Sequence, residues 1–200
     1  MVNTGRVGIL LPQPLLRGRR RPRVALVGRP RTGKSSLFVA ASSASPQHRL
    51  LRHGDARDEC VVDIGLEQIS LVDLPAVDSL HSPRSRDLPL LEYLLWGDRR
   101  PAVAAHEDDL PAESLEAPDV LIQVVDATAL QRDLELSLEL CLLGKPLLIA
   151  LNRVDEARRK GVYVNGRALS EQLGVPVCST VAHMGIGVTD LFVAALEAVR

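Results

Sequence analysis

The chain has 200 residues, 46% of them apolar, and a formal net charge of −1, which fits one domain with a full core rather than two domains. Its three cysteines, Cys60, Cys141 and Cys178, are far apart and lack C-x-x-C spacing, so they indicate reduced, buried thiols and neither a disulfide framework nor a zinc site. No apolar run approaches the ~20 residues of a membrane-spanning helix, and we expect a cytoplasmic protein.

Residues 1–21 are expected to form a flexible basic arm, because arginines cluster at its end as Arg17, Arg19, Arg20 and Arg21. Such a cluster is typical of a solubilising tail, and contact with anionic lipid or nucleic acid is the alternative. Aromatic residues make up 2% of the chain, so nucleic acid is the less favoured partner.

From residue 22 to residue 200 the sequence alternates between strand and helix patterns. Largely apolar runs predict buried strands at 23–27, 60–66, 69–72, 120–125, 147–151 and 175–179. Helices are predicted at 34–41, 88–95, 130–143, 166–173 and 189–199. This order favours an α/β fold with three layers and a mostly parallel sheet. Residues 99–118, rich in proline and acidic side chains, predict an exposed loop.

The helix predicted over residues 130–143 depends on two opposing signals. Leucine recurs at every second position from Leu134 to Leu142, which is the period of a strand. Leucine and glutamate nevertheless favour helix, and Gly144 followed by Pro146 is typical of a helix end. We therefore predict a helix here.

A phosphate-binding loop follows the first strand. The G-x-x-x-x-G-K-[ST] pattern lies between a predicted strand and a predicted helix, as a P-loop requires. Its backbone N–H groups and the helix N-terminus would face the phosphates, Lys34 would reach the β and γ phosphates, and the Ser35 hydroxyl would bind Mg²⁺. The candidate nucleotide-binding residues are Gly28, Arg29, Pro30, Arg31, Thr32, Gly33, Lys34, Ser35 and Ser36.

Asp73 follows the predicted strand at 69–72 and begins the segment Asp73-Leu74-Pro75-Ala76. In such sheets ligands bind at the carboxyl ends of the strands. A carboxylate there can hold Mg²⁺ through a water, so Asp73 joins Ser35 as a candidate metal residue. A turn or helix-capping aspartate is the alternative.

A base-recognition element is predicted at the end of the strand at 147–151. Asn152-Arg153-Val154-Asp155 resembles the N-K-x-D element of GTPases, in which the aspartate accepts hydrogen bonds from guanine N1–H and the exocyclic amine. The segment after the last strand would place Val181 and the Ala182 N–H near the guanine oxygen. The expected ligands are therefore GTP or GDP. Asp126, at another strand end, is interpreted as a turn residue.

Together these elements resemble the cytosolic G domain of the bacterial ferrous-iron transporter FeoB. The resemblance covers about residues 23–196 and rests on LVDLP at 71–75, DVLIQVVDATAL at 119–130, ALNRVDEAR at 150–158 and ALSEQLGVPV at 168–177. It implies GTP binding, slow hydrolysis and a regulatory tie to a separate membrane iron permease, at the inner face of the membrane. The family's helical regulatory and permease domains do not appear in this sequence.

Three positions depart from the family's pattern. Ala76 replaces the glycine of D-L-P-G, which predicts a stiffer switch because alanine disfavours positive φ. No threonine occurs between Ser45 and Asp63 to bind Mg²⁺, and Cys60, Val61 and Val62 align near its place. Arg31 stands where the family often has asparagine, so it either supplies positive charge near the phosphates or points to solvent. Lys34 and Arg31 are the candidate catalytic residues.

Three functions fit these observations. The first is a weak GTPase that regulates iron(II) uptake. The second is a non-switching pseudo-GTPase that only binds nucleotide, for which Ala76 and the missing threonine argue. The third is a GTPase of ribosome or tRNA maturation, because G-R-P-x-x-G-K-S-S-L also suits those families and the basic arm could contact RNA.

Overall fold

The computed structural model describes residues 20–43, 51–53, 57–81, 88–97 and 117–200. In chain order the strands and helices are β1 (Arg23–Val27), α1 (Lys34–Ser43), β2 (Leu51–His53), β3 (Arg57–Ile64), β4 (Glu67–Asp73), α2 (Leu88–Trp96), β5 (Val120–Asp126), α3 (Leu130–Cys141), β6 (Leu147–Asn152), α4 (Val154–Arg159), α5 (Gly166–Leu173), β7 (Val177–Ser179), the 3-10 helix η1 (Ala182–Met184) and α6 (Val188–Glu197).

The strands form one seven-stranded sheet in the order β2-β3-β4-β1-β5-β6-β7. β1 pairs in parallel with β4 and β5, and β6 pairs in parallel with β5 and β7. β3 is antiparallel to both of its neighbours. The predicted mostly parallel α/β fold is therefore confirmed, and the carboxyl ends of β1, β4, β5 and β6 meet at one edge.

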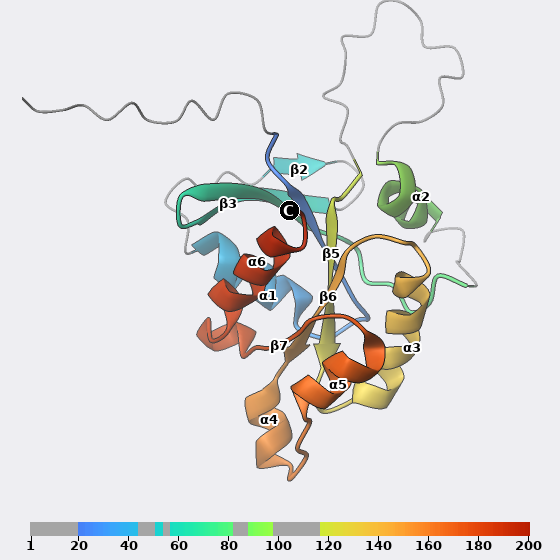
Figure 1. The fold of residues 1–200 in the computed structure, drawn as a ribbon, viewed down its shortest axis with the longest axis vertical. Coiled ribbons are helices and arrows are strands. Elements are labelled where there is room, and N and C mark those ends of the chain that lie inside the picture. Colours follow the sequence, from blue (N-terminus) through green and yellow to red (C-terminus); the bar gives the residue numbers. More distant parts are fainter. Residues whose placement is uncertain (1–19, 44–50, 54–56, 82–87, 98–116) are drawn as a thin grey trace, which may run out of the picture.

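Helices cover both faces of the sheet, as Figure 1 shows, with α1 and α6 on one face and α2 and α3 on the other. Alternate residues of β1 separate the two cores. Val24 and Leu26 pack with α1 and α6, whereas Ala25 and Val27 pack with α2 and α3. This accounts for the apolar run without polar alternation, because both faces of the strand are buried.

The leucine-rich segment is a helix, as predicted, although its leucines alternate. Its buried positions are Asp133, Leu136, Ser137 and Leu140, which follow helical spacing, while Leu138 is exposed. The alternate leucines therefore lie on two sides of α3, and only part of them reaches the core.

Several predicted boundaries were wrong for identifiable reasons. The strand predicted at 60–66 ends at Ile64, because Gly65 has a φ of +64° and starts the turn into β4. The strand predicted from Val175 begins at Val177, after Pro176, which has no N–H for the ladder. Two short elements, β2 and α4, were missed because they span three and six residues. The thiols also differ, since Cys60 is buried but Cys141 is exposed.

Candidate functional site

The phosphate loop runs from the end of β1 to the start of α1, and its glycines are held in crowded surroundings. A Cβ on Gly28 would lie 2.8 Å from the Val124 carbonyl oxygen. Gly33 has a φ of +92°, and its Cβ would lie 2.2 Å from the Asn152 amide nitrogen. Both positions therefore require glycine, one because of the neighbouring backbone and the other because of conformation and contact together.

Lys34, Ser35 and Asp73 come together at the edge where β1 and β4 end. The Lys34 ammonium donates to Asp73 Oδ1 at 2.5 Å and also to the Leu74 carbonyl oxygen. The Ser35 hydroxyl donates to Asp73 Oδ2 at 3.0 Å. A hydroxyl and a carboxylate beside each other are hard oxygen ligands that suit Mg²⁺, and the ammonium suits phosphate. The residues therefore fit the predicted metal and triphosphate.

The rest of the loop is held to its surroundings by polar contacts. Thr32 is fully buried and its hydroxyl donates to the Arg29 carbonyl oxygen at 3.0 Å. The Arg29 side chain reaches Glu135 of α3 at 2.9 Å. Arg31 has a φ of +68° and is exposed. Pro30 within the loop and Ser36 just after it are also exposed.

Asn152, at the end of β6, joins the phosphate loop to the segment after β7. Its side-chain nitrogen donates to the Thr32 carbonyl oxygen at 3.0 Å. Its side-chain oxygen accepts from the Ala182 N–H at 3.0 Å and from the Thr180 hydroxyl at 3.3 Å. Asn152 is buried, so these hydrogen bonds fix the distance between the two ends of the site.

Asp155 lines a cavity of about 460 Å³ on the same edge. Its Oδ2 accepts from Arg159 at 3.0 Å, while its Oδ1 is buried and has no hydrogen-bond partner among the described residues. A buried acceptor without a partner is costly unless a ligand supplies the donor. The residues that line the cavity are Gly33, Ser36, Asn152, Arg153, Asp155, Glu156, Arg159, Ala182 and His183.

Of the two residues predicted near the guanine oxygen, Ala182 lines this cavity and Val181 is not among its lining residues. Val181 is buried and pairs with Ile186 through an isolated bridge. The Ala182 N–H, expected to face a guanine oxygen, donates to the Asn152 side chain instead. In this conformation Ala182 therefore forms part of the wall of the cavity, and its N–H belongs to the hydrogen bonds around Asn152.

Sequence reasoning missed a contact of Asp126, which it interpreted as a turn residue. Asp126 is buried at the end of β5 and accepts from Arg153 of the base-recognition element at 3.0 Å. The sequence pattern gave no signal for this contact, because it depends on β5 and β6 being neighbours in the sheet.

The segment after Asp73 packs against the sheet and α3. The Val77 N–H donates to the Gly28 carbonyl oxygen at 3.2 Å. Glu139 accepts from the Ser79 hydroxyl at 2.7 Å and from the Leu80 N–H. Burial acts to raise the pKa of Glu139, but these hydrogen bonds outweigh it and bring the pKa below its ordinary value of 4.5.

Ala76 lies in that segment without backbone strain. Among the described non-glycine residues positive φ occurs at Arg31 and Arg153, so Ala76 has a negative φ. Its methyl group is therefore compatible with this conformation. A conformation that needs positive φ at this position would be disfavoured by about 1–2 kcal/mol.

The residues aligned with the missing threonine lie within the sheet. Cys60, Val61 and Val62 belong to β3 and pair with β4. Burial, followed by the nearby charges of Glu59 and Asp73, raises the pKa of Cys60 to about 12. Cys60 therefore stays a neutral thiol, which is a poor ligand for Mg²⁺.

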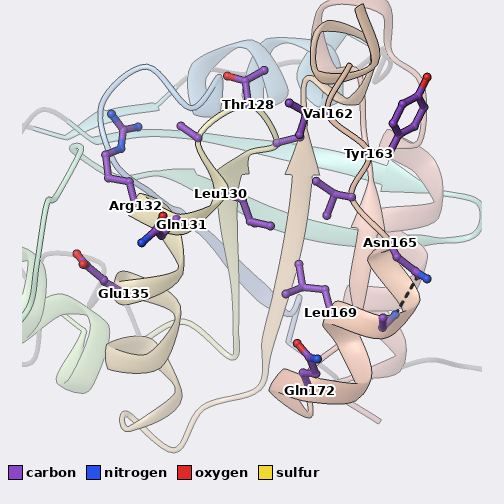
Figure 2. Close-up of a pocket in the computed structure, with 14 residues that line it drawn as sticks. Thr128, Leu130, Gln131, Arg132, Glu135, Val162, Tyr163, Asn165, Leu169 and Gln172 are labelled. Atoms are coloured by element: carbon purple, nitrogen blue, oxygen red, sulfur yellow. Dashed lines mark hydrogen bonds between the residues drawn. The ribbon is translucent and has the colours of Figure 1, made fainter. Parts of the chain in front are cut away.

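A larger cavity of about 860 Å³ opens between α3 and α5, as Figure 2 shows. Leu130 and Leu169 face it from the two helices, and Tyr163 projects beside it. The predicted nucleotide-binding residues are not among those that line it. This cavity is the larger of the two. The smaller cavity is nevertheless the better candidate for a nucleotide site, because several of the predicted nucleotide-binding residues line it.

Two predictions fall mainly outside the described residues, namely the basic arm over residues 1–19 and the acidic loop up to residue 116. Next to them, Arg20 forms an ion pair with Asp119 at 2.6 Å. Within the described ranges, no helix is long and apolar enough to cross a membrane.

Comparisons with known proteins agree with this geometry. The sequence model of the FeoB_N family, described as ferrous iron transport protein B, matches residues 22–195. The chain is 34% identical to an Fe(2+) transport protein A/FeoB fusion protein of Porphyromonas gingivalis over 85% of its own length and 18% of the relative. It is 33% identical to the Fe(2+) transporter FeoB of Helicobacter pylori over 80% of its length and 22% of the relative. The chain thus spans about a fifth of these relatives.

Solved structures give the same answer. The FeoB G domain of Methanococcus jannaschii matches with a TM-score of 0.70 and 29% identity, over 90% of this chain and 99% of that one. The cytosolic domain of the T. maritima FeoB iron transporter in its GMPPNP form matches with a TM-score of 0.72 and 27% identity, over 90% and 65%. The match to the family model covers most of the sequence, and the chain therefore belongs to the FeoB_N family and has the fold of its G domain.

Proposed function

We propose that this chain binds a guanine nucleotide, GTP or GDP, together with Mg²⁺. The observation that carries the proposal is Asp155, whose buried Oδ1 lacks a partner among the described residues while the side chain lines a cavity on the phosphate-loop edge. Guanine presents two adjacent donors, N1–H and the exocyclic amine, and adenine does not present this pair. Asp155 can accept both, which makes guanine the base that fits.

The phosphate end supports the same proposal. Lys34 and Ser35 lie at the start of α1, where backbone N–H groups favour anions. Mg²⁺, held by Ser35 and through a water by Asp73, would neutralise phosphate charge. Arg31 and Lys34 remain the candidates for stabilising charge during hydrolysis. The Lys34–Asp73 ion pair would have to open as Lys34 turns to the phosphates.

We further propose that the chain takes part in the regulation of iron(II) uptake. The relatives that it matches are Fe(2+) transporters, and it covers about a fifth of their length. A membrane iron permease is the partner that this relationship supports, and the working location is then the cytoplasmic face of the membrane. The FeoB family match favours this function over ribosome or tRNA maturation.

Calorimetric titration with GDP in the presence of Mg²⁺ tests the binding. Lys34→Ala and Asp155→Ala should each weaken the affinity by at least about tenfold, because each removes a charge-assisted contact. Lys145→Ala is a matched control, since Lys145 also donates to a carbonyl oxygen, that of Pro118, but at the opposite end of β6. Equal affinity in all four proteins would contradict the proposal.

A non-switching nucleotide-binding module is the second candidate. It is supported by the segment after Asp73, which Glu139 and the Gly28 carbonyl oxygen hold in place. Phosphate release from GTP by the wild-type protein and by Lys34→Ala separates the two functions. A GTPase requires release that depends on Lys34. A non-switching module predicts equal rates in the two proteins and similar affinities for GDP and a non-hydrolysable GTP analogue.

A further inference from the structure

An ion pair joins the carboxyl ends of β5 and β6 beside the cavity that Asp155 lines. The Arg153 guanidinium donates to Asp126 Oδ2 at 3.0 Å, and the Ala127 N–H donates to the Asn152 carbonyl oxygen at 2.9 Å. The Asp126 side chain is 8% exposed and that of Arg153 is 36% exposed. The pair thus has one buried member and one that borders the cavity.

Asp126 is a fixed anchor for this pair. Its Oδ1 accepts from both the N–H and the hydroxyl of Thr128, each at 2.8 Å. Its own N–H donates to Asp133 Oδ2 at 2.9 Å. Thr128 lies at the rim of the larger cavity in Figure 2, on the other side of the strand end. With these bonds in place, Asp126 offers Arg153 an acceptor in one defined direction.

Arg153 has an unusual backbone conformation at the start of α4. It precedes the helix with a φ of 62° and a ψ of 32°, the left-handed conformation that arginine rarely adopts. Asp155 lies in the first turn of that helix, two residues later. A disfavoured backbone conformation persists only where its surroundings hold it, and the ion pair with Asp126 is a side-chain contact that can hold Arg153.

We propose that Asp126 and Arg153 form a positioning pair that holds Asp155 where it meets the exocyclic amine of guanine. The inference rests on the proposed guanine-nucleotide binding and deepens it. Asp155 thus recognises the base, and the Asp126–Arg153 pair determines how selectively it does so.

The test compares GDP with inosine diphosphate, which keeps N1–H but lacks the exocyclic amine. Wild-type protein should bind GDP about tenfold more tightly, the value of one charge-assisted hydrogen bond. Arg153→Met keeps an unbranched, flexible side chain but removes the guanidinium and its charge, and Asp126→Asn keeps the shape of the acceptor. Both should reduce the preference to less than about threefold, whereas Arg153→Lys should retain most of it.

Arg167→Met is the control, because Arg167 forms an ion pair of the same length, 3.0 Å, with Glu171 on the exposed side of α5, and neither residue lines the cavity that Asp155 lines. Its preference for GDP should equal that of the wild type. An unchanged preference in Arg153→Met, even with a lower melting temperature, would show a merely structural pair and overturn the inference alone. Wild-type protein that binds neither nucleotide would overturn the proposed function as well. If Asp126→Asn does not fold, Arg153→Met decides the outcome, since Arg153 is partly exposed.

Discussion

The two ends of the candidate site are built in different ways. At the phosphate end the backbone itself is the binding surface, and Gly28 and Gly33 are required because neighbouring atoms leave no space for a Cβ. At the base end the candidate binding group is the Asp155 side chain, and hydrogen bonds of Asn152 and of the Asp126–Arg153 pair join the strand ends and loops near it.

The difference explains why one end is conspicuous in the sequence and the other is not. A backbone surface demands glycine at fixed spacing, which leaves a strong motif. A side-chain network can exchange one donor for another of similar reach, as with Arg153 in the place of lysine. Substitutions should therefore be most damaging where they disturb the backbone surface, and milder where they remove side-chain contacts.

The largest effect is expected for Gly33→Ala. Gly33 has a positive φ, and a Cβ added there would lie 2.2 Å from the Asn152 side chain. That side chain is buried and cannot move without losing hydrogen bonds. We expect a loss of about 3 kcal/mol in the free energy of unfolding, measured by urea denaturation. Gly144→Ala is the control, because Gly144 has a φ of +66° but open space around it, and should cost about 1 kcal/mol. Equal losses would show that the contact with Asn152 is unimportant.

The next largest effect is expected for Asn152→Ala, which removes the connection between the two ends. It leaves the Thr32 carbonyl oxygen and the Ala182 N–H buried without their partner. Thermal or urea unfolding should show a loss of about 2–3 kcal/mol. Asn165→Ala, which removes one exposed hydrogen bond at the start of α5, should cost about 1 kcal/mol. A smaller loss for Asn152→Ala than for Asn165→Ala would contradict the proposed connection.

A smaller and pH-dependent effect is expected for Glu139→Gln. The folded-state pKa of Glu139 is lowered from 4.5, so its contribution is fully present above that value and is lost as the pH falls through the folded-state pKa. The variant should be less stable than the wild type by about 1 kcal/mol at pH 7, with the difference shrinking below pH 4.5. The free energy of unfolding of both proteins, measured by urea denaturation from about pH 3 to about pH 7, checks this.

Glu171→Gln, on the exposed side of α5, is the matched control for that series. It should change the free energy of unfolding by less than about 0.5 kcal/mol at neutral pH. A difference between Glu139→Gln and wild type that stays constant down to the lowest pH would mean that the carboxylate charge does not hold the segment.

The smallest effect is expected for Glu135→Gln, which breaks the ion pair with Arg29. Glu135 is 71% exposed, so solvent and salt screen the pair. The loss should be about 0.5 kcal/mol in low salt and should vanish near 1 M salt. A loss of stability that persists in high salt would show that this ion pair is not screened by solvent and salt, and would contradict the prediction.

Much of the fold was readable from the sequence because local patterns and tertiary structure agree. Apolar runs marked the strands of the sheet, and glycine with proline marked the end of α3 despite its alternating leucines. Short elements such as α4 were not predicted, since six residues carry too little periodicity. The ion pair of Asp126 with Arg153 was not predicted for another reason, because it depends on which strands are neighbours.

Two acidic residues on α3 contact separate parts of the site. Glu135 binds Arg29 of the phosphate loop, and Glu139, one helical turn later, binds the segment after Asp73 at Ser79 and Leu80. The phosphate loop and the segment after Asp73 are thus both bonded to one helix, on which Leu138 is exposed, as is Leu142 just after its end. Any displacement of α3 would therefore disturb contacts of the phosphate loop and of that segment at the same time.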